Sequence, residues 1–326
     1  MADCLNLSRI EIEALLQIED GFEAIKDAYI AVTDGRCDLP PVGYLGFPAA
    51  HGDCHIKYGH IAGDPVFVIK IATGFYDNPL KNLPSSNGIM LALSAKTGQV
   101  VAILQDEGFL TDLRTGIGAA LATQAGCHSD ARRVGVVGTG IQARLQIRCL
   151  NALMPDRSLA FSVWGRSEEK MHHLAEDLAP HQILVTVQPD LETLCASADI
   201  LHTTTSAKAP LIRSGWIKDG THITASGADA PGKQELDSTL TARADLLILD
   251  SVAQCIDHGE VAIPAAAGLL SPDRYRTLGK VLSGQQAGRS APTEITIADL
   301  TGLGSQDIAI ARTALDAYAR HTTTDK

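Results

Sequence analysis

The chain contains 326 residues, a length that suggests two domains, because single domains usually have about 100–200 residues. Hydrophobic residues make up 45% of it and charged residues 20%, as in ordinary packed proteins. The formal net charge of −11 argues against a nucleic-acid partner, since an acidic protein repels phosphate backbones. Small anions are not excluded, because a local group of basic residues can bind them inside an acidic whole.

Segments that would target or anchor the protein are not visible in the sequence. The N-terminal stretch MADCLNLSRIEIEALL carries acidic residues and lacks a long apolar core, and no apolar run reaches the roughly 18 residues of a membrane span. The seven cysteines are widely spaced and form no C-x-x-C pair, which favours reduced thiols. We therefore expect a cytoplasmic protein with no membrane partner.

The first third of the chain reads as a mixture of helices and antiparallel strands. Ser8 and Glu11 predict a capping box in front of a helix, and a second helix is expected from Gly21 to Thr33, ending at Gly35. Strands are predicted over 54–61 and 66–72, and two more within 89–104 around a turn at 96–98. A helix over 111–125 follows.

From about residue 133 the pattern changes to strands that alternate with helices. Strands are predicted over 134–138, 159–164, 183–187, 199–204, 245–249 and 294–299, and helices over 141–152, 167–178 and 190–197. A final helix from 305 to 320 follows. Such alternation indicates βαβ units and a mostly parallel sheet covered on both faces. The predicted fold class is therefore α/β, a Rossmann-type doubly wound parallel sheet accompanied by an α+β domain.

A glycine-rich turn joins the first of these strands to its helix. Gly138-Thr139-Gly140-Ile141-Gln142-Ala143 is a G-x-G-x-x-A sequence. Gly138 permits the tight turn, Gly140 lets the backbone approach a pyrophosphate, and Ala143 allows close helix–strand contact. The helix N-terminus would then face the phosphates. A tight turn without any ligand is the alternative reading.

The end of the next strand bears on the choice between NAD and NADP. NAD-binding proteins usually carry Asp or Glu there to bind the ribose 2′-hydroxyl. This strand ends at Trp164-Gly165-Arg166-Ser167, with no acidic residue. Arg166 and Ser167 either meet a 2′-phosphate or belong to a solvated loop. The pattern favours NADP(H), with NAD(H) as the other possibility.

Five motifs in this order resemble the ornithine cyclodeaminase/mu-crystallin family over nearly the whole chain. They are Val68-Ile69-Lys70, Leu113-Arg114-Thr115-Gly116, the fingerprint with Gln142, the block from Gly227 to Leu236, and Asp299-Leu300-Thr301-Gly302. The resemblance implies a homodimer and hydride chemistry at the α-carbon of an amino acid or its imine. It predicts a substrate-binding and dimerisation domain of residues 1–130 and 305–326, and a dinucleotide-binding domain of residues 131–304.

The resemblance also predicts individual site residues. Lys70 and Arg114 would bind the substrate carboxylate, and Asp229 would act as acid and base beside the reacting nitrogen, with Lys70 in the catalytic set. The expected cofactor contacts are Arg114, Thr115, Gly138, Gly140, Ile141, Gln142, Ala143, Arg166, Ser167, Thr204, Thr301 and Gly302. Taken alone, Lys70 in an apolar strand either faces outward or has an anionic partner, Arg114 is a surface helix residue and Asp229 forms a turn.

Lys57 is where the chain departs from the ornithine cyclodeaminase pattern. Thirteen residues before Lys70, the resemblance predicts an acid that would hold the distal amine of ornithine, but here the residue is Lys57. A lysine repels a substrate ammonium. The stretch from Pro41 to Gly46 also lacks the arginine that often anchors the carboxylate in this family. Lys57 either takes over that anchor or is an exposed strand lysine.

These cations favour an anionic substrate without a free distal amine. The working hypothesis is an NAD(P)H-dependent reductase that converts a small α-imino acid, such as iminosuccinate or Δ1-pyrroline-2-carboxylate, to the L-amino acid. One alternative is an ornithine- or lysine-type cyclodeaminase that releases ammonia. Another is a NADP-dependent small-molecule binding protein of the mu-crystallin type. His51, Cys54, His55 and His60 fit no standard zinc spacing, so we expect no metal.

Overall fold

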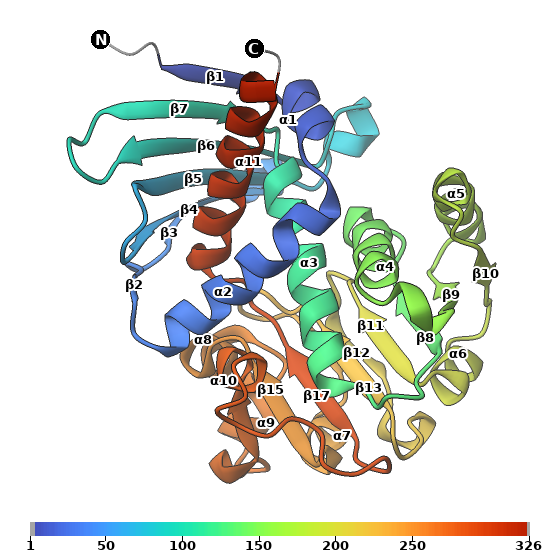
Figure 1. The fold of residues 1–326 in the computed structure, drawn as a ribbon. Coiled ribbons are helices and arrows are strands. Elements are labelled where there is room, and N and C mark those ends of the chain that lie inside the picture. Colours follow the sequence, from blue (N-terminus) through green and yellow to red (C-terminus); the bar gives the residue numbers. More distant parts are fainter. Residues whose placement is uncertain (1–3, 325–326) are drawn as a thin grey trace. The chain divides into compact units, whose positions relative to one another are not determined.

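A computed structural model of the chain describes residues 4–324. The chain divides into two compact units, unit 1 with residues 1–114 and 303–326 and unit 2 with residues 115–302 (Figure 1). The sequence placed the first boundary after residue 130, whereas the units divide within helix α3 (Phe109–Gly126). The later turns of α3 belong to unit 2 because they bind it directly: Thr123 Oγ1 lies 2.9 Å from His202 Nε2.

Unit 1 combines one sheet with helices from both ends of the chain. Its strand order is β1-β7-β6-β5-β4-β2, and β3 also pairs with β4. All of these pairings are antiparallel except that of β1 with β7. The strands are β1 (Leu5–Ser8), β2 (Cys37–Asp38), β3 (Gly43–Phe47), β4 (Gly52–Ile61), β5 (Val66–Phe75), β6 (Ser86–Ser94) and β7 (Val100–Gln105). The helices are α1 (Arg9–Leu15), α2 (Phe22–Thr33), the start of α3, and α11 (Gly304–Thr324).

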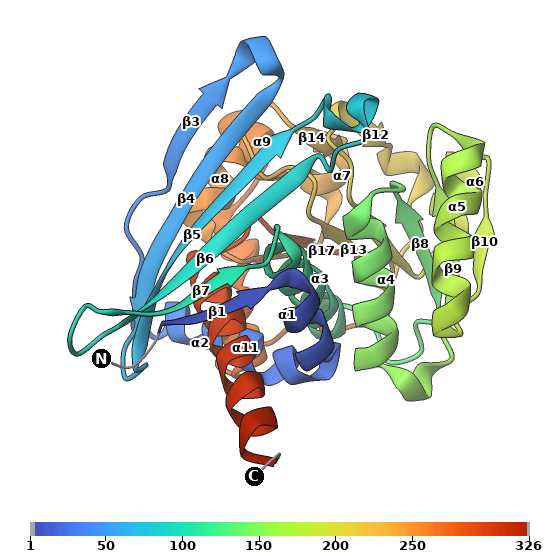
Figure 2. The same cartoon turned by 90° about the horizontal axis from the view of Figure 1, so that it is seen from above.

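Helix α11 lies across one face of this sheet, against β4 and β5 and beside α2, as Figures 1 and 2 show. The local signals that predicted the unit 1 elements are confirmed. Ser8 and Glu11 form the capping box of α1, and Gly35 takes a left-handed φ of +70° two residues after the last residue of α2. The turn between β6 and β7 contains Gly98 with a φ of +69°.

Unit 2 contains a parallel sheet in the order β10-β9-β8-β11-β13-β17-β15-β16. The strands are β8 (Arg133–Val137), β9 (Ala160–Trp164), β10 (Val185–Val187), β11 (Ile200–Thr203), β13 (His222–Ala225), β15 (Leu246–Leu249), β16 (Tyr275–Thr277) and β17 (Thr296–Asp299). A separate pair is formed by β12 (Lys208–Ile212) and β14 (Gln234–Leu236). The helices are α4 (Ile141–Leu153), α5 (Glu168–Leu178), α6 (Leu191–Ser197), α7 (Ser238–Arg243), α8 (Val252–His258), α9 (Ala262–Ala266) and α10 (Leu278–Leu282).

The predicted Rossmann-type α/β class is confirmed. Strands β11, β13, β15 and β17 are buried at every position, as expected for a parallel sheet with both faces covered. Helix α4 packs against β11, and α6 packs against β8 and β9. Within residues 4–324, no helix is both long enough and apolar enough to cross a bilayer.

Candidate active site

The glycine-rich turn of unit 2 lies where its sheet reverses its strand order. The chain runs from β8 outward to β9 and β10, then returns to place β11 on the other side of β8. In such sheets ligands bind at the carboxyl ends of the two strands beside this reversal. Gly138 follows the carboxyl end of β8 and Thr204 follows that of β11. A Cβ added to Gly138 would lie 2.4 Å from Thr204 Oγ1, so the two meet at this point.

The two glycines of the turn have different surroundings. Gly138 has a φ of +126° and no room for a side chain. Gly140 has an extended conformation at the N-cap of α4, and a Cβ there would meet no atom within 4 Å. The protein fold therefore requires glycine at 138 but leaves open space at 140. Open space beside the N-terminus of a 13-residue helix fits the close approach of a pyrophosphate.

The remaining residues of the fingerprint divide between exposed and buried positions. Ile141 opens α4 with 48% of its surface exposed, whereas Ala143 is fully buried. Arg144 Nη1 donates to Thr139 O at 2.6 Å and to Gly140 O at 3.2 Å, so the arginine holds the turn's carbonyls. The residues present fit a dinucleotide phosphate group.

Arg166 and Ser167 lie between β9 and α5. Arg166 is exposed, and no described residue accepts a hydrogen bond from its guanidinium. Ser167 is the N-cap of α5, and its Oγ accepts from Lys170 N at 3.3 Å. The arginine is thus available to an external anion, while the serine already has a structural role.

Asp229 lies on the loop between β13 and β14, where it is exposed. Its Oδ1 accepts from Lys233 Nζ at 2.5 Å. Two buried groups fix this loop: Glu235 accepts from Gly227 N at 2.9 Å, and Gln146 Nε2 donates to Ser226 Oγ at 2.8 Å. The structure therefore anchors the backbone near Asp229 while its carboxylate stays open to solvent.

Thr301 and Gly302 follow β17, and both are held by one buried aspartate. Asp250 Oδ2 accepts from Thr301 N at 2.9 Å and from Gly302 N at 2.7 Å, and Oδ1 accepts from Thr301 Oγ1 at 3.0 Å. Burial raises the pKa of Asp250. Asp250 thereby fixes the backbone conformation at the end of this strand.

Unit 1 brings Lys57, Lys70 and Arg114 together. Lys57 on β4 lies directly opposite Lys70 on β5, so both side chains leave the same face of the sheet. A Cβ on Gly304, the first residue of α11, would lie 4.0 Å from Lys57 Cβ. The lysines are therefore on the face that α11 covers, and Lys57 is not an exposed strand lysine but a half-buried one.

Asp307, in the first turn of α11, is the anionic partner of both buried cations. Lys70 Nζ lies 2.8 Å from Asp307 Oδ2, and Arg114 Nε lies 3.1 Å from Asp307 Oδ1. Both contacts are ion pairs between side chains that are at most 8% exposed. The sequence left open whether Lys70 faces outward or has an anionic partner. The structure shows that it is buried and paired with Asp307.

The charges in this cluster shift one another's pKa values. Burial disfavours the Lys70 ammonium and lowers its pKa to about 7, with Arg114 and Lys57 adding to the effect and Asp307 opposing it. Burial raises the pKa of Asp307, but the neighbouring cations outweigh burial and hold it below its usual value. At neutral pH the aspartate is thus ionised.

Asp307 and its neighbour Gln306 were not predicted from the sequence. Gln306 Oε1 accepts from Arg114 Nη1 at 3.4 Å, and Gln306 Nε2 donates to Arg114 O at 3.3 Å and to Tyr29 Oη at 3.0 Å. The sequence did indicate that such a partner exists, because Lys70 lies in an apolar strand and a buried lysine needs an anionic partner. The rule does not say which of 38 acidic residues that partner is.

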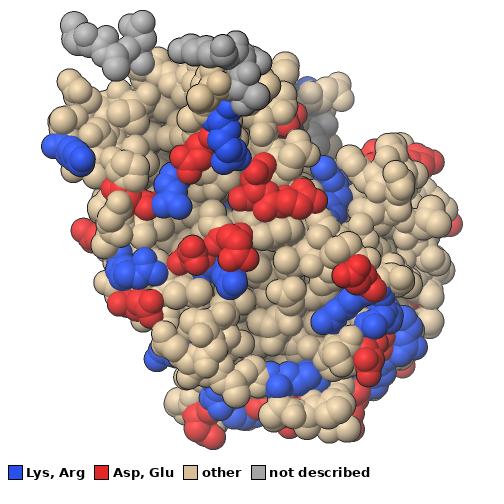
Figure 3. All heavy atoms as spheres, in the orientation of Figure 1, with Lys and Arg blue, Asp and Glu red and all other residues tan. Residues whose placement is uncertain are grey.

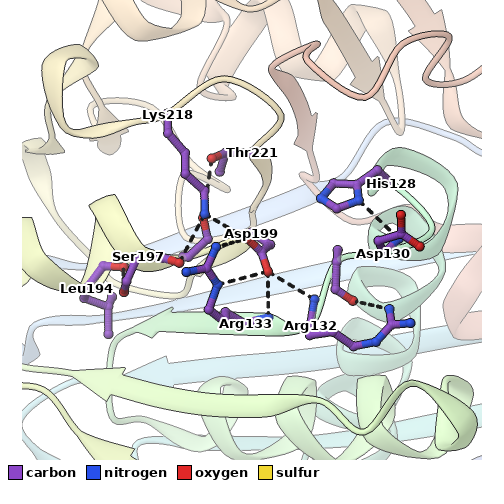
Figure 4. Close-up of polar contacts among 11 residues, drawn as sticks. His128, Asp130, Arg132, Arg133, Leu194, Ser197, Asp199, Lys218 and Thr221 are labelled. Atoms are coloured by element: carbon purple, nitrogen blue, oxygen red, sulfur yellow. Dashed lines mark hydrogen bonds and ion pairs between the residues drawn. The ribbon is translucent and has the colours of Figure 1, made fainter.

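A second charged cluster in unit 2 has a structural role (Figure 4). Asp199 precedes β11, and its carboxylate accepts from the backbone N–H groups of Arg132 and Arg133 and from the Arg133 guanidinium and Lys218 ammonium. Burial raises the pKa of Asp199, but these donors outweigh it and leave the pKa far below its usual value. The cluster joins the amino ends of β8 and β11, the end of the sheet opposite the glycine-rich turn.

The remaining charged side chains indicate neither a surface patch of one charge nor a metal site among the described residues. On the face shown in Figure 3, Lys and Arg side chains lie among Asp and Glu side chains. Among residues 4–324, no group of three or more His, Cys, Asp or Glu side chains is arranged to hold a metal ion.

Comparison with known proteins identifies the family of this chain. The model of the ornithine cyclodeaminase/mu-crystallin family matches residues 3–321, and the chain belongs to this family. It is 38% identical to an uncharacterized cyclodeaminase of Sinorhizobium fredii over 94% of this chain and 90% of the relative. It is 33% identical to the iminosuccinate reductase of Paracoccus denitrificans over 95% of each chain.

Two solved structures match nearly the whole length of this chain. The chain matches the Thermococcus litoralis Δ1-pyrroline-2-carboxylate reductase, solved with NADH and L-proline, with a TM-score of 0.90, 26% identity and 98% coverage of each chain. It matches the Paracoccus denitrificans iminosuccinate reductase, solved with NAD+, with a TM-score of 0.88, 30% identity and coverage of 98% of this chain and 97% of the other.

Proposed function

We propose that this protein reduces a small α-imino acid to the L-amino acid with NAD(P)H. It is an NAD(P)-dependent oxidoreductase. The observation that carries the substrate class is the cluster of Lys57, Lys70 and Arg114, which is suited to a carboxylate. The imine takes up one hydride and one proton, and the cofactor leaves oxidised. Candidate substrates are iminosuccinate and Δ1-pyrroline-2-carboxylate.

The proposed machinery divides into carboxylate binding and proton transfer. Lys57, Lys70 and Arg114 bind the substrate carboxylate and so orient the C=N carbon. When bound, the nicotinamide supplies the hydride to that carbon. Asp229, directly or through water, takes up a proton from the solvent and passes it to the nitrogen. Lys233 keeps the Asp229 carboxylate oriented until the substrate arrives.

The cofactor residues are proposed from the geometry of unit 2. Gly138, Gly140, Ile141, Gln142 and Ala143 hold the dinucleotide at the start of α4, with Thr204 beside them. Thr115, directly after Arg114 on α3, and the Thr301–Gly302 backbone complete the contacts. Arg166, with Ser167, binds a 2′-phosphate, so the preferred cofactor is NADP(H). We further propose that the protein acts in the cytoplasm.

The proposed homodimer rests on an apolar edge of unit 1. Every residue of β3 after Gly43 is exposed, including Tyr44, Leu45 and Phe47. Such side chains on an edge strand favour burial against a second copy. Light scattering of the protein should give the mass of a dimer, and the double substitution Tyr44→Ser with Phe47→Ser should give a monomer. A wild-type monomer would refute this proposal.

The test of the function is a panel of imines with both cofactors. Oxidation of NADPH and NADH is measured with oxaloacetate plus ammonia, pyruvate plus ammonia or methylamine, Δ1-pyrroline-2-carboxylate and Δ1-piperideine-2-carboxylate. Turnover of one or more supports the reductase, and preference for oxaloacetate plus ammonia identifies a dicarboxylate substrate. Ammonia release from ornithine or lysine without net cofactor reduction would identify a cyclodeaminase. Cofactor binding without turnover of any compound would identify a binding protein.

A further inference from the structure

The buried acid Asp307 uses its two carboxylate oxygens for two different cations. Oδ2 lies 2.8 Å from Lys70 Nζ and Oδ1 lies 3.1 Å from Arg114 Nε. The three side chains are 2–8% exposed. They come from three distant segments, strand β5, helix α3 and the first turn of α11. One carboxylate therefore sets the separation of the two cations.

The arrangement leaves donors of both cations unused. Arg114 donates through Nε to Asp307 and through Nη1 to Gln306, and no described residue accepts from Nη2. Lys70 has three N–H bonds, and its 2.8 Å contact with Asp307 Oδ2 can use only one of them. Lys57, opposite Lys70, adds a third cationic side chain to the cluster. It can therefore bind an added anion.

Gln306 fixes the orientation of the guanidinium from the same turn of α11. Its Oε1 accepts from Arg114 Nη1 and from Leu303 N, and its Nε2 donates to Tyr29 Oη and Arg114 O. A guanidinium held at both Nε and Nη1 has little freedom to rotate. Its remaining Nη2 edge is thereby aimed in one direction.

The surrounding sheet face shows that stability alone does not require these charges. Lys57, Lys70, Met90 and Leu104 form one cross-strand row, and Met90 and Leu104 are completely buried. An apolar side chain would fit the same row at position 70. Replacing a buried ion pair by apolar residues is often neutral or stabilising. A role in ligand binding explains why charges occupy this position.

We propose that Asp307 is the positioning residue of the carboxylate-binding site: it holds Lys70 and Arg114 at a fixed separation, so that their unused N–H groups converge on the substrate carboxylate. The proposal rests on the proposed function of those two cations. Other groups that face Lys70 are Lys57 on β4 and Asp106, which follows β7 and lies close enough to interact with it electrostatically. Asp307 is the one that contacts both cations.

The test compares Asp307→Asn with a matched control, Asp64→Asn. Asp64 is another buried aspartate of unit 1 and is also ion-paired to α11, through Arg312, but it contacts neither Lys70 nor Arg114. Steady-state kinetics on the best imine from the panel should show KM raised at least tenfold in Asp307→Asn and changed less than threefold in Asp64→Asn. The basic limb of kcat/KM should move to lower pH in Asp307→Asn only, because Lys70 loses its neighbouring anion. Equal KM values and pH profiles in the two variants would overturn the proposal.

Two further measurements separate this proposal from folding defects and from the proposed function. Asp307→Glu keeps the charge but displaces it, so KM should rise while the pH profile stays that of the wild type. Calorimetric titration with malonate, a dicarboxylate that cannot be reduced, tests the site without turnover. If the wild type reduces no imine but binds malonate, and Asp307→Asn binds it at least tenfold more weakly, the function is wrong and the positioning role holds. If the wild type binds no malonate, the positioning role is wrong even when imines are reduced.

Discussion

Lys57 and Lys70 lie directly opposite each other on neighbouring antiparallel strands, both on the face that helix α11 covers. Like charges in this relation normally destabilise a sheet. Here the Asp307 carboxylate offsets part of the repulsion, since it is ion-paired with Lys70. The remaining positive charge is what an anionic substrate would neutralise.

Lys57→Gln should separate binding from stability. Loss of one like charge should leave the free energy of unfolding unchanged or raise it by up to about 1 kcal/mol. The kcat/KM for the imino acid should fall about tenfold or more, as expected when one charge-assisted hydrogen bond is lost. Kinetics and urea unfolding measure the two effects, with Lys57→Arg as the control that keeps the charge. Unchanged kcat/KM together with a less stable protein would mean that Lys57 serves the fold.

The two glycines of the dinucleotide turn give a matched pair of variants. Gly138→Ala places a Cβ 2.4 Å from Thr204 Oγ1 at a left-handed φ, so the free energy of unfolding should fall by about 2 kcal/mol or more. Gly140→Ala meets no atom and has an allowed conformation, so stability should stay within about 0.5 kcal/mol of the wild type. Cofactor affinity in Gly140→Ala should nevertheless fall at least about tenfold, because the added Cβ occupies the space of the pyrophosphate. Equal cofactor affinity in Gly140→Ala and the wild type, measured by fluorescence titration with NADPH and NADH, would contradict the phosphate role.

The sequence predicted those parts of the fold that have local signals. These signals depend on residues close together in the chain. They are the capping box of α1, the glycine at position 35 that ends α2, and the change near residue 133 to strands that alternate with helices. Short elements without such signals were missed, among them β1 and β13. Strand β13, His222–Ala225, has two polar side chains that nevertheless face a buried hydrogen-bond network, so its hydropathy does not mark it as a core strand.

Only those residues of the candidate site that lie in a recognisable motif or an unusual sequence setting could be predicted. The turn at Gly138 and the cations at 57, 70 and 114 could be named, because each lies in a recognisable motif or an unusual place. Asp307 could not be named, because its contact with Lys70 spans more than 200 residues and its own setting, an acid in a first helical turn, is ordinary. The partner of a buried charge becomes visible only when the fold is known.

Arg166→Ala should change cofactor preference. If the exposed guanidinium binds the 2′-phosphate, loss of one charge-assisted contact should lower kcat/KM with NADPH at least about tenfold and leave the value with NADH within about twofold. Lys170→Ala, in the first turn of helix α5, which follows Arg166 and Ser167, is the control for a general loss of positive charge. Parallel changes with both cofactors would show that Arg166 belongs to a solvated loop.

Asp229→Asn should abolish the proton step and keep cofactor binding. General acid catalysis is typically worth about 10²- to 10⁴-fold, so kcat for imine reduction should fall in that range while the Kd for the cofactor stays within about twofold. Asp219→Asn is a matched control, because Asp219 is another exposed aspartate of unit 2 with an ion-pair partner, Arg243. Imine reduction at the wild-type rate in Asp229→Asn would exclude the acid role.

The buried carboxyl of Asp299 should make stability depend on pH. Burial raises its pKa to about 7; Oδ2 accepts from Val261 N, and Oδ1 has no partner among the described residues. Between pH 4 and pH 7 the folded protein keeps a proton that the unfolded chain releases, so this group lowers the free energy of unfolding by up to about 1.4 kcal/mol for each pH unit of increase. Asp299→Asn cannot titrate and should reduce that slope, whereas Asp245→Asn, an exposed aspartate that also accepts a backbone N–H, should not. Urea unfolding from pH 5 to pH 8 measures the slopes, and equal slopes in Asp299→Asn and the wild type would mean that Asp299 is already ionised at pH 5.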